Sequence, residues 1–142
     1  MESEKKIVIA VACMDYRMHH PESNYVKNLY DFYGADKIYF ISLAGPDGTI
    51  MDKQKSRYEF LLNEIRNGVK LFRDRGYSNI TCVVGAHTEC AGHNVEEEVH
   101  IRDIKELRKR LNTEGIEGLS DEIGSMIAIR GESDMEWEIK EV

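Results

Sequence analysis

The sequence lacks an apolar run long enough to cross a bilayer, and it lacks an excess of basic residues. Its 19 Lys and Arg residues are outnumbered by 26 Asp and Glu residues, which gives a net charge of -7. This acidic balance argues against nucleic acid or an anionic membrane as a partner. Residues 1–6 are polar and charged and the apolar run after them is short. We therefore expect no signal peptide and, by default, a cytoplasmic location.

Cysteine is scarce as well, and the count of three is odd, so a framework made only of disulfides is excluded. In a reducing compartment, cysteines near a histidine indicate metal ligands or nucleophiles instead. Repeats, linkers and low-complexity tracts are also missing. A chain of 142 residues with 42% hydrophobic residues fits a single domain over residues 1–142.

The hydrophobic pattern predicts alternating strands and helices. Short β-branched or apolar runs predict buried strands, longer runs with a period near 3.6 predict helices, and a final alternating run predicts an edge strand. The expected strands are 6–12, 37–43, 79–85, 124–130 and 136–140, and the expected helices are about 25–33, 56–75 and 94–112. On the second of these helices Tyr58, Leu61, Leu62, Ile65, Val69 and Phe72 repeat near the helical period, and the first has Tyr25, Val26, Leu29 and Phe32 as its apolar positions. This order predicts an α/β fold with a mostly parallel twisted sheet of four to five strands and helices on both faces.

Chemically reactive residues follow two of the predicted strands. Cys13 comes directly after the first strand, within the stretch Cys-Met-Asp-Tyr-Arg, and His87 follows the third, within His-Thr-Glu-Cys. The turn Ala44-Gly45 follows the second strand. Ligands of open parallel sheets bind outside the carboxyl ends of the strands, so we expect all three segments to line one crevice.

The two stretches together supply the donors of a zinc site. Cys13 and Cys90 offer thiolates and His87 offers an imidazole, and two cysteines with one histidine and an open fourth position are typical of catalytic zinc. Asp15 could occupy the fourth position, or Arg17 could hold that carboxylate away through a bidentate ion pair and leave the position to water. A metal-free Cys–His nucleophile or redox pair stays open as an alternative.

The other candidate residues favour structural interpretations. Cys82 lies in the middle of a predicted strand and is expected in the core, and His100 lies in a charged helix and is expected at the surface. His93 is a possible ligand, but solvation at a helix start is favoured for it. The neighbours His19 and His20 are expected in a solvated loop. Tyr16 could face the crevice or a subunit contact.

On these residues the chain resembles the β-class carbonic anhydrases, which carry Cys-x-Asp-x-Arg after the first strand and His-x-x-Cys after a later one. The resemblance implies that Cys13, His87 and Cys90 bind Zn²⁺ and that Asp15 and Arg17 form the catalytic dyad that opens or closes the site. It also implies reversible hydration of carbon dioxide to bicarbonate by a homodimer or a higher homo-oligomer. Tyr16, Phe32, Tyr33 or Tyr39 could supply an apolar wall for this small substrate.

Two departures from the family pattern keep other functions open. The family often has Arg-Asn-Ala-Gly where this chain has Ser42-Leu43-Ala44-Gly45, and an N-terminal helical arm where this chain starts almost directly on its first strand. Related proteins hydrolyse carbon disulfide or carbonyl sulfide at the same kind of site. A protein that binds zinc without catalysis, with Asp15 permanently on the metal, is a further alternative.

Overall fold

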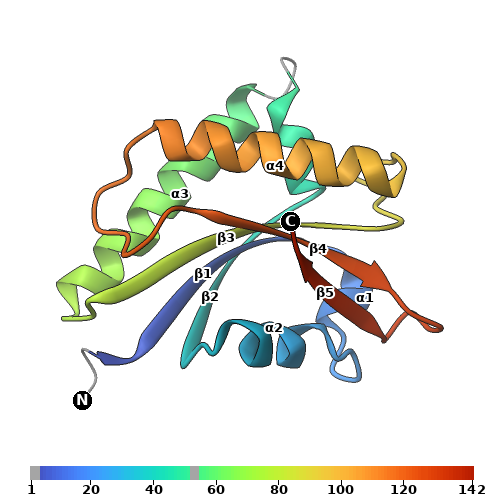
Figure 1. Ribbon diagram of the computed structural model, residues 1–142, viewed down its shortest axis with the longest axis horizontal. Coiled ribbons are helices and arrows are strands. Elements are labelled where there is room, and N and C mark those ends of the chain that lie inside the picture. The colour runs from blue at the N-terminus through green and yellow to red at the C-terminus, as the bar shows by residue number, and fades with distance from the viewer. Residues whose placement is uncertain (1–3, 52–54) are drawn as a thin grey trace.

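The computed structural model describes residues 4–51 and 55–142, which form one α/β domain (Figure 1). Its sheet has the strand order β2-β1-β3-β4-β5. Strands β2, β1, β3 and β4 run parallel to one another, and β5 runs antiparallel to β4. The strands are β1 (Lys6–Cys13), β2 (Lys37–Leu43), β3 (Asn79–His87), β4 (Gly124–Arg130) and β5 (Trp137–Glu141). The predicted fold class is confirmed, and β1 and β3 extend far enough to include Cys13 and His87 themselves.

Helices cover both faces of the sheet, as predicted. In Figure 1, α3 and α4 lie above the sheet, while α1 and α2 lie below it. The helices of the described residues are α1 (Tyr16–His19), α2 (Tyr25–Tyr33), α3 (Lys55–Asp74) and α4 (Glu97–Thr113), and a 3₁₀ segment, η2, spans Pro46–Ile50. The sequence predicted neither α1 nor η2, because each is too short to show a helical period. None of these helices is long and apolar enough to cross a membrane.

The interior strand β1 is buried on both faces, which explains its unbroken apolar run. Ile7, Ile9 and Val11 belong to the cluster beneath α3 and α4, and Val8 and Ala10 belong to the cluster that α2 covers. Burial of one such Ile or Val side chain contributes about 1.5–3 kcal/mol to folding. Of the four apolar positions predicted for α2, Tyr25 and Leu29 are buried, but Phe32 is 47% exposed and lies off the buried face.

The sheet has a topological switch point between β1 and β3. These strands are neighbours, yet the chain leaves β1 toward α1 and α2 on one face and leaves β3 toward α4 on the other (Figure 1). Connections that depart in opposite directions leave a crevice at the carboxyl ends of the two strands. The two sequence stretches with the reactive residues lie at this place.

Candidate metal centre

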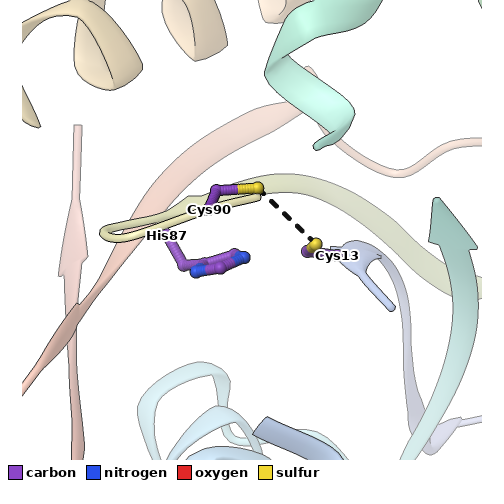
Figure 2. A group of neighbouring side chains, drawn as sticks. All are labelled: Cys13, His87 and Cys90. Carbon is purple, nitrogen blue, oxygen red and sulfur yellow. Dashed lines mark hydrogen bonds between the residues drawn. The ribbon is translucent and has the colours of Figure 1, made fainter. Parts of the chain in front are cut away.

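Three buried side chains converge at the switch point (Figure 2). Cys13 ends β1, His87 ends β3, and Cys90 follows in the turn after β3. The two Sγ atoms are 3.8 Å apart, and one donor atom from each residue lies within 4.8 Å of the others. Each residue is at most 5% exposed. The structure therefore brings together the three residues predicted as zinc ligands.

The His87 ring presents an unused donor atom to this group. Its Nδ1 lies 2.7 Å from the carbonyl oxygen of Thr88, which can only accept a hydrogen bond, so Nδ1 carries the ring proton. Its Nε2 then has a lone pair, is buried, and has no hydrogen-bond partner within residues 4–51 and 55–142. A backbone carbonyl on the other ring nitrogen is the usual arrangement for a metal-binding histidine.

Backbone amides surround the two sulfur atoms. The Gly45 N–H donates to Cys13 Sγ at 3.4 Å, and the backbone N–H groups of Gly92 and His93 favour the thiolate of Cys90. The contact between the two sulfur atoms lowers the pKa of Cys13 well below its usual value and raises the pKa of Cys90. A metal ion held by both sulfurs would bind them as thiolates, so its binding would release the protons that they carry.

Two glycines allow the loops after β2 and β3 to touch. A Cβ atom on Gly92 would lie 2.7 Å from the carbonyl carbon of Ala44, and one on Gly45 would lie 2.7 Å from that of Gly92. Gly45 also has φ +59°, a conformation that side chains rarely adopt. The side chain of Arg57, on α3, donates to the Ala44 carbonyl and holds this loop. The Ala44-Gly45 pair thus allows the two loops to pack closely.

Asp15 and Arg17 lie beside the three donors as a closed ion pair. Arg17 Nε donates to Asp15 Oδ1 at 3.0 Å and Nη2 donates to Oδ2 at 2.7 Å, while the Arg17 backbone N–H donates to Oδ1 at 2.9 Å. Burial alone would raise the pKa of Asp15, but these hydrogen bonds and the charge of Arg17 lower it below its ordinary value. Asp15 Oδ2 is 3.9 Å from His87 Nε2, so the ionised carboxylate borders the donor group.

Residues that the sequence did not single out hold this ion pair and the His87 ring. Trp137 is only 2% exposed, and its ring packs edge to face against the His87 ring with 5.6 Å between the ring centres. The Arg17 guanidinium carbon lies 5.5 Å from the centre of the Trp137 ring. Arg17 Nη2 also donates to the carbonyl oxygen of Glu89 at 3.0 Å. Trp137 was predicted only as part of an edge strand. Its alternating pattern showed that one face is buried, but not that this face lies under the metal ligands.

The donor set fits a soft or borderline metal ion such as zinc. Two thiol sulfurs and one imidazole nitrogen, all buried, make up three of the four ligands of a tetrahedral site. The unpartnered Nε2 atom of His87 is the observation that distinguishes this group from an ordinary hydrogen-bonded cluster. Cys82 is not part of it: it is 3% exposed in mid-strand, and burial raises its pKa to about 12, which confirms the prediction of a core residue.

The histidine predictions divide into two groups. His20 is exposed in the loop after α1, as predicted, whereas the prediction of a loop was wrong for His19, which ends α1 and is exposed there. His19 Nε2 lies 3.0 Å from the Cys13 carbonyl oxygen. The prediction for His100 was wrong, because this side chain is fully buried and its Nδ1 lies 2.6 Å from Asp47 Oδ2. The prediction that His93 is solvated was also wrong, because its side chain is only 13% exposed and its Nε2 lies 2.7 Å from Asp103 Oδ2.

The aromatic residues proposed as a substrate wall are spread over the molecule. Tyr39 packs edge to face on Phe72 of α3, on the opposite side of the sheet from α2. Phe32 and Tyr33 pair with each other on α2. Tyr16 is 77% exposed and therefore lines no enclosed cavity within one chain.

Comparison with protein-family models gives a match. A family model described as "Putative carbonic anhydrase" matches residues 3–119, a segment that includes all three donors together with Asp15 and Arg17. Searches of the curated proteins and of the solved structures find no match.

Proposed function

Because the chain belongs to the carbonic anhydrase family described by that match, we propose that it is a zinc enzyme for the reversible hydration of carbon dioxide to bicarbonate. A zinc ion held by two thiolates and one imidazole would supply the acidification of water, lowering the pKa of a bound water to about 7. Cys13, Cys90 and His87 Nε2 would hold the ion. The proposal depends most on one observation, that the buried Nε2 atom of His87 has no hydrogen-bond partner among the described residues.

The proposed role of Asp15 is to accept a hydrogen bond from the nucleophile that the metal centre would supply, and so to orient that nucleophile toward the substrate carbon. This role requires an ionised carboxylate that stays off the metal. The four hydrogen bonds from Arg17 support it, because they occupy both carboxylate oxygens while Oδ2 remains 3.9 Å from His87 Nε2. Arg17 is thus a positioning residue, whose flat guanidinium matches the carboxylate in a way that lysine cannot.

We further propose that the active form is a cytoplasmic homodimer or a higher homo-oligomer. The exposure of Met14 and Tyr16 supports it, because these side chains flank Cys13 and Asp15 and are 58% and 77% exposed. Carbon dioxide carries no charge, so its binding relies on apolar surface more than on hydrogen bonds. A second subunit over Met14 and Tyr16 would enclose such a surface next to the metal centre.

The test is stopped-flow hydration of carbon dioxide by the zinc-loaded protein, measured across roughly pH 6 to 9, the range set by the expected pKa of about 7 for the bound water. We expect a rate above buffer that rises with pH through neutrality. Carbon disulfide and carbonyl sulfide, tested in the same assay format, address the related hydrolase activity. A zinc-loaded protein that is inactive on carbon dioxide overturns the proposal, and turnover of either sulfur compound would then assign the same centre to hydrolysis.

A further inference from the structure

A second group of side chains that could hold a metal ion lies on the side of the sheet that carries α4. It consists of Asp47 in η2, His93 in the loop before α4, and Asp103 in α4, and we name it the Asp47–His93–Asp103 cluster. One donor atom from each residue lies within 4.8 Å of the others. The two carboxylate side chains are 1% and 4% exposed, and the His93 side chain is 13% exposed. The cluster shares no residue with the Cys13–His87–Cys90 group.

The donor atoms lie close enough together to contact one small cation after a shift of a few tenths of an ångström. His93 Nε2 is 2.7 Å from Asp103 Oδ2 and 3.8 Å from Asp47 Oδ2. In a tetrahedral site with ligand distances of about 2.1 Å, neighbouring donors lie about 3.4 Å apart, a value between these two. Gly48 leaves room for the imidazole, since a Cβ atom there would be 3.1 Å from His93 Nδ1.

Two buried atoms point to a missing partner. Asp47 Oδ1 is buried and has no hydrogen-bond partner in the described part of the chain, and the same is true of His100 Nε2. His100 contacts the other Asp47 oxygen through Nδ1 at 2.6 Å, which orients the carboxylate as histidines and carboxylates do around metal ligands. An unsatisfied carboxylate oxygen in a native interior calls for an explanation, and a bound cation supplies one.

The charges lead to the same conclusion. Buried carboxylates need compensation, because the loss of hydration is costly. Asp103 has a partner in Arg102, at 3.1 Å, but no Lys or Arg within residues 4–51 and 55–142 pairs with Asp47. His93 Nε2 faces both carboxylates, and one proton on that atom can be donated well to only one of them. A divalent ion would instead bind both at once.

We propose that the Asp47–His93–Asp103 cluster binds a second divalent transition-metal ion, through His93 Nε2 and one or two oxygens of each carboxylate. A mixed imidazole and carboxylate set suits ions of the zinc and manganese class. The ion would join η2, the loop that leaves Cys90, and α4, which packs against η2. These segments carry the Gly45, Gly92 and His93 amides next to the two thiols, so the second ion would fix the surroundings of the first centre. This proposal does not depend on the carbonic anhydrase activity.

The test uses Co²⁺, because a thiolate-bound ion shows sulfur-to-cobalt charge transfer in the near ultraviolet and an ion bound by nitrogen and oxygen does not. The full chain with Cys13→Ser and Cys90→Ser removes the thiolates. We expect this variant to bind one Co²⁺ with visible absorption, without charge transfer, and with a higher melting temperature. Adding His93→Gln should abolish that binding and that shift, whereas adding His20→Gln, at an exposed histidine, should leave both unchanged.

The unmodified protein provides a second measurement in case the cysteine variant does not fold. Titration with Co²⁺ should saturate the charge-transfer band at one ion per chain and total bound metal at two, and Asp103→Asn should reduce the total to one while the band persists. A total of one in the unmodified protein would overturn the proposal. So would binding to the cysteine variant that survives His93→Gln. The first result would mean that protons alone satisfy the cluster, and the second that the ion binds without His93.

Discussion

Arg17 binds both oxygens of the Asp15 carboxylate, with Nε 3.0 Å from Oδ1 and Nη2 2.7 Å from Oδ2. The pair stands at the edge of the Cys13–His87–Cys90 group, and Asp15 Oδ2 reaches within 3.9 Å of His87 Nε2. In this arrangement the carboxylate is close enough to contact a group at the metal, yet Arg17 already occupies its oxygens. The state of this one carboxylate separates an open centre from a closed one.

Arg17→Lys should impair catalysis without removing the metal. A lysine keeps the charge but cannot hold both oxygens in one plane, so Asp15 would be free to shift toward the metal. A displacement of about 1 Å at a reacting centre can lower the rate about 100-fold, and we expect a loss of this order in the carbon dioxide hydration rate. Arg66→Lys, at a half-exposed guanidinium on α3, is the matched control and should retain the full rate. An unchanged rate in Arg17→Lys would refute the positioning role.

The same ion pair should make part of the stability sensitive to acid. The pKa of Asp15 lies below its ordinary value in the folded state, so the unfolded chain binds a proton at Asp15 more readily. The contribution of the pair is therefore present above about pH 4, the ordinary pKa of an aspartate, and is lost as pH falls through the native pKa. Melting temperatures of the native chain and of Asp15→Asn are measured from about pH 3 to about pH 7, a range that spans the ordinary aspartate pKa. The two melting temperatures should converge at the acid end of this range. Parallel curves would show that Asp15 contributes nothing to the acid response.

Metal content should distinguish the three cysteines. Cys13→Ser, Cys90→Ser and His87→Ala should each lower the zinc retained during dialysis, because each removes one of three protein donors. Cys82→Ala is the matched control, since its thiol is buried in mid-strand and its pKa is raised to about 12. That variant should keep its zinc and lose about 1 kcal/mol of unfolding free energy, from the small cavity that it leaves. Equal zinc loss in all three cysteine variants would point to general unfolding and not to ligand removal.

Gly92→Ala should disturb the centre through the backbone. The added methyl would lie 2.7 Å from the Ala44 carbonyl carbon and 2.8 Å from Gly45 N, so the loops would have to separate. We expect a loss of about 1–3 kcal/mol in urea unfolding and weaker zinc binding in competition with a chelator. Gly124→Ala, where a Cβ atom would meet nothing within 4 Å, should change neither quantity appreciably. Equal behaviour of the two variants would contradict the proposed close packing of the loops.

The sequence predicted the Cys13, His87 and Cys90 group because of where these residues stand along the chain. Cys13 and His87 end buried apolar runs, and parallel strands bring such ends to one edge of a sheet. Cys90 follows from its spacing to His87. Neither inference needs knowledge of side-chain packing, and the structure places these residues together at the switch point.

The residues that the sequence did not reveal depend on tertiary contacts. His100 lies among charged residues on α4, but its own face is turned toward η2, where Asp47 binds it. Hydrophobic periodicity cannot recognise a buried face that is built from histidine and aspartate. Trp137 is far from Arg17 in sequence, and only the position of β5 beside β4 places it next to the ion pair. The sequence did not predict the short η2 helix or the turn around Glu89 either, because each has too few residues to show a hydrophobic period.

The most direct test of the central claim is the carbon dioxide hydration rate as a function of bound metal. Apoprotein is titrated with Co²⁺, and the stopped-flow rate is compared with the sulfur-to-cobalt charge-transfer band that reports on Cys13 and Cys90. The account predicts that activity rises with this band and saturates with it, whatever further metal the chain takes up. A fully developed band with no rate above buffer would contradict the claim that this centre hydrates carbon dioxide.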